Sequence, residues 1–181
     1  MARVLIVCST TDGQTRKICD RLARIVQGSG DHVSLVMIED SGELDPMSFD
    51  KVVIGARIRY GKHDSRVIEF VHRHASALNA MPSAFFSVNI VARKPEKNRP
   101  ETNPYVRKFL TQVAWRPTLL DVFAGKLDYP RYTFFDRQMI RFIMLVTKGP
   151  TQPDAVVEFT DWQRVEAFAQ AINAAPTRTR T

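Results

Sequence analysis

A run of hydroxyl-bearing side chains has the clearest chemistry in this sequence. Seven residues join a short apolar run, Val4 to Cys8, to a segment with helical periodicity: Ser9, Thr10, Thr11, Asp12, Gly13, Gln14 and Thr15. Such a turn presents free backbone N–H groups and the positive end of a helix dipole, which suits phosphate. It contains no Lys and neither glycine-rich signature of dinucleotide and triphosphate sites. The run favours one phosphate monoester held by neutral donors, with FMN as candidate. An ordinary capped turn is the alternative.

A second cluster follows the apolar run 51–55. It consists of Ala56, Arg57, Ile58, Arg59, Tyr60 and Gly61. Tyr60 or Ile58 could cover one face of a flavin ring, and either arginine could stabilise negative charge on the reduced ring. A solvated loop with two surface arginines is the alternative.

A third group begins in the apolar run 84–88. We expect it to contribute four cofactor contacts: Ser87, Val88, Asn89 and Val91. Four cations follow: Arg93, Lys94, Lys97 and Arg99. Two prolines keep this segment extended and out of the sheet. Arginine is well suited to a bidentate grip on carboxylate. The segment could therefore bind an anionic ligand, and a solvated run of charge is the alternative.

The remaining reactive side chains are scattered. His72 and His74 lie two apart on a predicted helix and face different directions, and no Cys/His ligand set occurs. We therefore expect no metal site, and two buried free thiols at Cys8 and Cys19. His63 could accept a proton beside the second cluster, with an ordinary surface histidine as the alternative.

Apolar runs alternate with helix-periodic segments along the chain. The expected strands are residues 4–8, 33–38, 51–55, 84–88 and 119–123, and Thr160 with Gln163 predicts a capping box for a last helix. This alternation indicates an α/β fold with a parallel sheet covered on both faces. Five strands fit a flavodoxin-like doubly wound sheet of order 2-1-3-4-5. Such a sheet brings the three clusters to one ligand site at its carboxyl edge.

The positive charge is concentrated in one part of the chain. The 181 residues carry 26 Lys and Arg against 19 Asp and Glu, a net charge of +7. Residues 91–148 hold twelve of the cations and five of the acids, so the remainder of the chain is neutral. The length fits one domain, expected over 1–174, with a flexible tail at 175–181. The segment lacks a recognisable nucleic-acid motif, so we expect no nucleic-acid partner.

The first cluster resembles the phosphate loop of flavodoxins, except that Asp12 stands where flavodoxins usually carry Thr. A carboxylate beside a phosphate is unfavourable unless it points away, for example as a helix cap. The form S-T-x-D-G-Q-T is similar to that of the flavodoxin-like, quinone-dependent protoporphyrinogen oxidases of bacteria. Further matches cover nearly the whole chain: V-I-G-A-R-I-R-Y-G (53–61), M-P-S-A-F-F-S-V-N-I-V-A-R-K-P-E-K (81–97), R-K-F-L (107–110), W-R-P (115–117), Y-P-R-Y (129–132) and T-D-W (160–162).

The resemblance implies a flavodoxin-like α/β fold, which here carries an extended basic insertion between strand four and the last helix. It also implies FMN-dependent oxidation of protoporphyrinogen IX to protoporphyrin IX in haem biosynthesis, with menaquinone or ubiquinone as acceptor. The substrate's propionates would meet the cations of residues 93–99. A flavodoxin-type electron carrier and an NAD(P)H:quinone reductase are the alternatives. Flavodoxins are usually acidic, which argues against the carrier. Homo-oligomerisation is left open.

The basic segment ends in a stretch rich in Phe and Met. Drawn as a helix, it places five apolar residues on one face: Phe135, Met139, Phe142, Ile143 and Val146. Packing on the sheet is its main expected role, and contact with an anionic membrane or a tetrapyrrole could coexist with it. No apolar run is long enough for a bilayer span, and we expect no export signal. We therefore expect a cytoplasmic protein, peripheral on the inner face of the cell membrane.

Overall fold

The main sheet of the computed structural model, which describes residues 1–177, is parallel and doubly wound. Its order is β2-β1-β3-β5-β6, made by β1 (Arg3–Ser9), β2 (His32–Met37), β3 (Lys51–Arg59), β5 (Ser83–Asn89) and β6 (Leu119–Ala124). A short strand, β4 (Lys62–His63), pairs antiparallel with the end of β3. With β4 set aside, this order corresponds to the expected 2-1-3-4-5. The predicted α/β class is confirmed.

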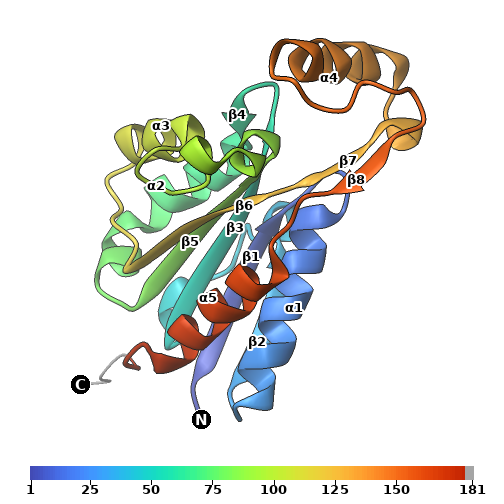
Figure 1. The fold of residues 1–181 in the computed structure, drawn as a ribbon. Coiled ribbons are helices and arrows are strands. Elements are labelled where there is room, and N and C mark those ends of the chain that lie inside the picture. Colours follow the sequence, from blue (N-terminus) through green and yellow to red (C-terminus); the bar gives the residue numbers. More distant parts are fainter. Residues whose placement is uncertain (178–181) are drawn as a thin grey trace.

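Helices cover both faces of the sheet (Figure 1). The helices are α1 (Gln14–Gly28) and α5 (Trp162–Ala174) on one face, and α2 (Ser65–Asn79) and α3 (Pro104–Gln112) on the other. Alternate strand residues point to opposite faces, so Ile6 lies in the first core and Val7 in the second. This winding brings the carboxyl ends of β1, β3 and β5 to one edge, beside the N-terminus of α1.

The second cluster belongs to a hairpin, whereas the sequence predicted a loop from residue 56 onward. β3 continues to Arg59, and Tyr60 and Gly61 connect it to β4. These two residues have φ values of 50° and 71°, which are typical of a tight two-residue turn. Ile58 pairs with His63 across the hairpin. The predicted strand end was wrong because this antiparallel pairing prolongs β3 beyond the buried apolar run.

A smaller unit stands beyond the carboxyl edge of the sheet. It consists of β7 (Lys126–Asp128), α4 (Phe134–Val146) and β8 (Val156–Glu158), and β7 pairs antiparallel with β8. We call residues 126–158 the roof. Figure 1 shows α4 above the sheet edge and against neither face. The expected packing of this helix on the sheet was therefore wrong. Its buried residue Met144 packs against Leu127 and Tyr129 within the roof itself.

The face of α4 expected to be buried is largely the exposed one. Phe135, Phe142 and Val146 are 68%, 67% and 66% exposed, and Phe134 and Leu145 are exposed as well. Only Met139 and Ile143 of the predicted set face inward. The helix is apolar around most of its circumference, so its periodicity did not identify the packed side.

The basic block is not a single insertion. Residues 91–148 include α3 and β6, which belong to the sheet and its covering helices, as well as most of the roof. They begin with two 3-10 turns, Ile90–Arg93 and Pro95–Lys97. The roof itself, residues 126–158, holds five cations and four acids, so most of the net positive charge lies outside the roof.

The last helix begins one residue later than the capping box predicted. Asp161 is the N-cap, and its side chain accepts a hydrogen bond from the backbone N–H of Arg164. Thr160 donates instead to the carbonyl of Ala124, at 2.7 Å. Residues 175–177 follow the helix without regular structure, and the rest of the predicted tail, residues 178–181, lies outside the described part of the chain.

Candidate functional site

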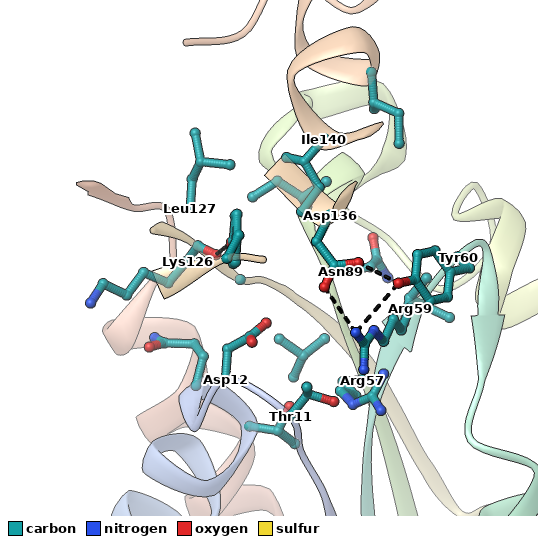
Figure 2. A pocket seen from close by; sticks show the side chains of 18 of the residues that line it. Thr11, Asp12, Arg57, Arg59, Tyr60, Asn89, Lys126, Leu127, Asp136 and Ile140 are labelled. Atoms are coloured by element: carbon teal, nitrogen blue, oxygen red, sulfur yellow. Dashed lines mark hydrogen bonds and ion pairs between the residues drawn. The ribbon is translucent and has the colours of Figure 1, made fainter. Parts of the chain in front are cut away.

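A cavity of about 640 Å³ lies between the carboxyl edge of the sheet and the roof. The three clusters predicted from the sequence converge on it (Figure 2). Thirteen of the predicted cofactor residues line it: Thr10, Thr11, Asp12, Gln14, Thr15, Arg57, Ile58, Arg59, Tyr60, Gly61, Val88, Asn89 and Val91. The cavity is therefore the candidate site.

Four predicted cofactor residues are not among the residues that line the cavity: Ser9, Gly13, Ala56 and Ser87. Ser9 is buried, and its hydroxyl donates to the carboxylate of Asp64, the N-cap of α2, at 3.1 Å. The Ser87 hydroxyl lies 2.9 Å from Nε2 of His63. These side chains hold the ends of the strands in place beneath the cavity.

The first cluster forms an open turn at the start of α1. Gly13 is the N-cap, with a φ of 86°, and its N–H donates to the Thr10 hydroxyl at 3.1 Å. No side chain within residues 1–177 caps this helix, so N–H groups of its first turn face the cavity edge without a side-chain partner. Asp12 is therefore not the helix cap that could have explained a carboxylate here. It lines the cavity instead (Figure 2).

An ion pair crosses the cavity. Arg59 at the end of β3 lies 2.9 Å from Asp136 of α4, and the Tyr60 hydroxyl donates to the same carboxylate (Figure 2). These bonds lower the pKa of Asp136, with the Tyr60 hydrogen bond as the largest cause. The hairpin that forms one wall is thereby tied to the roof.

Two charged side chains lie near the floor of the cavity, Asp12 at an exposed position and Arg57 half-buried. Burial raises the pKa of Asp12, although Arg57 and Arg59 oppose the shift. Burial lowers the pKa of Arg57, although Asp64 opposes it. The buried Nε of Arg57 has no hydrogen-bond partner among residues 1–177. A buried donor without a partner is costly, so this atom points to a ligand.

Twelve further lining residues, most of them in the roof, were not predicted as cofactor contacts, although contact of the Phe- and Met-rich helix with a tetrapyrrole was one of its expected roles. The cavity lining also includes Ile90, Tyr105, Gly125, Lys126, Leu127, Arg131, Tyr132, Thr133, Asp136, Met139, Ile140 and Ile143. The last four recur at i, i+3, i+4 and i+7 on one face of α4. That spacing is visible in the sequence, but it marks a helix face without saying that the face covers a ligand site.

The four cations predicted to bind substrate do not line the cavity. The Arg93 guanidinium donates to the carbonyl and hydroxyl of Thr147, at 3.1 and 2.8 Å, and so fastens the end of α4. The segment that follows is held by Asn103, which donates to the carbonyl of Lys97 at 2.9 Å, and by Arg164 of α5. It starts beside the cavity and continues away from it.

His63 is neither a surface residue nor part of the cavity lining. It is 8% exposed, and its ring lies 5.6 Å from that of Phe85 and 5.2 Å from that of Phe109. Burial lowers its pKa to about 4. A neutral histidine in this apolar setting supports the wall and does not reach a ligand.

No group of three or more His, Cys, Asp or Glu in residues 1–177 is placed to hold a metal ion. Cys8 and Cys19 are both buried and free. No helix in the same residues is long and apolar enough to cross a bilayer.

The cavity lining fits FMN. Threonine hydroxyls, the start of α1 and the unpartnered Nε of Arg57 suit a phosphate. Ile58, Tyr60 and Val91 offer apolar surface to a planar ring. A doubly wound sheet with such a site at its carboxyl edge defines a flavodoxin-like protein.

Comparisons with known proteins define the family more closely. The sequence model of a family described as "Flavodoxin domain" matches residues 5–154. The chain is 48% identical over 170 residues to the protoporphyrinogen IX dehydrogenase (quinone) of Escherichia coli strain K12, covering 94% of each chain. It is 47% identical over 175 residues to the Leishmania major protein of that name, covering 96% of this chain and 76% of that one. The chain belongs to this family of flavodoxin-domain proteins.

Solved structures support the fold. The two-electron reduced flavodoxin of Megasphaera elsdenii superposes with a TM-score of 0.54 at 16% identity, covering 95% of this chain and 99% of that chain. A flavodoxin of Streptococcus pneumonia TIGR4 gives 0.56 at 14% identity, covering 96% and 99%. At these identities the likeness shows the shared architecture alone.

Proposed function

We propose that this chain oxidises protoporphyrinogen IX to protoporphyrin IX, with FMN as cofactor and a membrane quinone, menaquinone or ubiquinone, as acceptor, in haem biosynthesis. The observation that carries the proposal is the roofed cavity, in which a hydroxyl-rich turn and an apolar ceiling face each other. The proposal is supported by relatives that bear the corresponding name over 94% of the chain.

The floor of the cavity would hold the cofactor. Thr10, Thr11 and Thr15 would donate hydroxyl hydrogen bonds to the phosphate, and Ile58 and Tyr60 would border the ring. FMN, when bound, supplies the two-electron chemistry that these side chains lack. Because the substrate loses six electrons, three successive two-electron rounds are needed, so a cavity that retains the macrocycle between rounds is an advantage.

The roof would position the substrate. Met139, Ile140 and Ile143 of α4 present apolar side chains toward the cavity and suit one face of a tetrapyrrole. Leu127 of β7 extends the same apolar surface. By excluding water, these groups would hold the reacting carbon of the macrocycle near the flavin ring. A simple electron carrier does not need such a ceiling, which is why the enzyme is favoured over the carrier.

We propose that the cations that follow β5 bind the propionate groups of the substrate. Lys94, Lys97 and Arg99 follow the cavity-lining residue Val91 in sequence without lining the cavity themselves, whereas the Arg93 guanidinium is bonded to Thr147. An Arg93 substitution would therefore disturb the roof as well as the charge. Lys94→Ala with Lys97→Ala is the cleaner variant, and we expect a higher KM for protoporphyrinogen with FMN still bound. An unchanged KM would exclude propionate binding by this segment.

The exposed side of α4 would contact the membrane that contains the quinone. Phe134, Phe142 and Leu145 are 77%, 67% and 69% exposed, and the exposed cations Arg131 and Lys148 flank the helix. Apolar side chains between cations suit an anionic membrane surface. The proposed location is therefore peripheral, on the inner face of the cell membrane, with the cavity opening near the bilayer.

Rapid mixing under anaerobic conditions distinguishes the three candidate functions. The FMN-loaded protein is mixed with protoporphyrinogen or with NADPH, and loss of flavin absorbance is followed. The proposed enzyme is reduced by protoporphyrinogen. Fast reduction by NADPH alone would indicate a nicotinamide-dependent quinone reductase. Reduction by neither, together with rapid exchange of electrons with a flavodoxin reductase, would indicate a carrier.

A further inference from the structure

The floor of the cavity contains an arginine that the protein itself does not use. Arg57 is aligned with Val88 in the pairing of β3 with β5, one position beyond the aligned pair Ser9 and Ala56. Ala56 points into the α2 side of the sheet, so strand alternation directs Arg57 to the α1 side. Arg57 and Thr11 both line the cavity, and Figure 2 draws them at the same end of it.

Two acids, Asp64 and Asp12, act on the charge of Arg57. The stronger of the two, Asp64, already bonds to Arg66 at 2.7 Å. The buried Nε of Arg57 has no partner among residues 1–177. Leaving a half-buried guanidinium nitrogen unsatisfied is unfavourable unless a ligand completes its hydrogen bonds.

We propose that Arg57 binds the phosphate of the flavin mononucleotide and supplies, from β3, the positive charge that the turn of residues 9–15 lacks. A guanidinium donates through several N–H groups to phosphate oxygens, whereas a threonine offers one neutral donor. This inference rests on the proposed function only for the identity of the cofactor. It differs from the sequence-based expectation that Arg57 faces the isoalloxazine ring.

Asp12 contributes a negative charge to the same proposed phosphate site. It lines the cavity, and Arg57 is the first of the cations that act on its carboxylate. A phosphate bound beside Arg57 would be attracted by the guanidinium and repelled by this carboxylate. Removing either charge should therefore change phosphate affinity in opposite directions and leave ring binding unchanged.

The test compares two flavins that differ only in the phosphate. Dissociation constants for FMN and riboflavin are measured by quenching of flavin fluorescence in the wild-type apoprotein and in four variants. The variants are Arg57→Ala, Arg57→Lys, Asp12→Asn and the control Lys62→Ala, at the exposed position of β4. In Arg57→Ala we expect FMN affinity to fall about 10- to 100-fold and riboflavin affinity to change less than about two-fold. Arg57→Lys should recover part of the loss. Asp12→Asn should raise FMN affinity alone.

Two results would overturn the proposal. An equal loss of both flavins in Arg57→Ala would place the guanidinium at the ring, and unchanged FMN affinity would mean that it binds neither part. The far-UV circular dichroism spectrum and the urea unfolding midpoint of each variant serve as the folding control. Because the readout is flavin affinity, a protein that selects FMN through Arg57 yet fails to oxidise protoporphyrinogen would contradict the proposed reaction and leave this inference intact.

Discussion

Arg59 and Asp136 lie 77 residues apart in sequence, yet Nη2 of the arginine is 2.9 Å from Oδ2 of the aspartate. The arginine ends β3, and the aspartate lies in the first turn of α4. Tyr60 donates to the same carboxylate. The three side chains attach the roof to the hairpin across the cavity (Figure 2).

Replacing Asp136 with Ala should loosen the roof without unfolding the sheet. Arg59 is 41% exposed, so screening limits the pair to about 1 kcal/mol or less. We expect amide exchange in residues 133–146 to become a few times faster, with the protection of β1 and β3 unchanged. Asp154→Ala, an exposed position in the roof, is the matched control. Equal protection of α4 in both variants would show that the roof is held by other contacts.

The buried His63 should make the protein less stable in acid. Its folded pKa is about 4, and its ordinary value is 6.5. Between these pH values the unfolded chain binds a proton that the folded protein does not. The free energy of unfolding therefore keeps its full value above pH 6.5 and falls as the pH drops toward 4. The difference between the two pKa values of His63 corresponds to about 3 kcal/mol of unfolding free energy.

Urea unfolding of the wild type and His63→Gln tests this pH dependence. Gln can retain the hydrogen bond to the Ser87 hydroxyl but does not titrate. We expect the wild type to lose more unfolding free energy than the variant between pH 7.5 and 4.5. Parallel losses would mean that His63 does not contribute to the acid response.

Gly55 should tolerate no side chain. A Cβ at this position of β3 would lie 2.3 Å from Cζ of the Phe86 ring, which fills the space in the core. We expect Gly55→Ala to lower the free energy of unfolding by about 1–3 kcal/mol. Gly28→Ala at the end of α1, where a Cβ meets nothing within 4 Å, should be neutral or slightly stabilising. Similar unfolding curves for both variants would contradict the packing described.

The exposed face of α4 should bind anionic membranes. Liposome flotation is expected to recover the wild type with vesicles containing phosphatidylglycerol, less so as salt rises. Phe142→Ser with Leu145→Ser should reduce this recovery several-fold, whereas Val156→Ser, at an exposed position of β8, should leave it unchanged. If wild type and double variant float equally, or if recovery is independent of anionic lipid, the face does not serve this purpose.

The sheet and its covering helices could be predicted because their signals are local. Val4, Leu5, Ile6 and Val7 are fully buried, as a continuous apolar run of a parallel strand should be. The position of the cavity at the carboxyl edge of the sheet followed from the winding, and five residues of the turn 9–15 line it. In contrast, the concentration of positive charge in residues 91–148 did not correspond to a structural unit, because these residues contain α3 and β6 as well as most of the roof.

The hairpin and the roof could not be predicted for the same physical reason. β4 has only two residues and exists through pairing with β3, and the turn between them places Tyr60, a residue with a bulky side chain, at a positive φ beside Gly61. Asp136 acquires its role from Arg59, a partner far away in sequence. Likewise, Arg93 was predicted to bind substrate, but its guanidinium donates a hydrogen bond to Thr147, which lies 54 residues away in sequence.

The most direct test of the proposed function is the formation of fluorescent protoporphyrin IX from protoporphyrinogen IX under anaerobic conditions. The purified protein is supplied with FMN and menaquinone, and control reactions omit the protein, the flavin or the quinone. We expect rapid porphyrin formation that requires the protein, the flavin and the quinone together. Porphyrin formation no faster than in the reaction without protein, or equally fast without quinone, would contradict it.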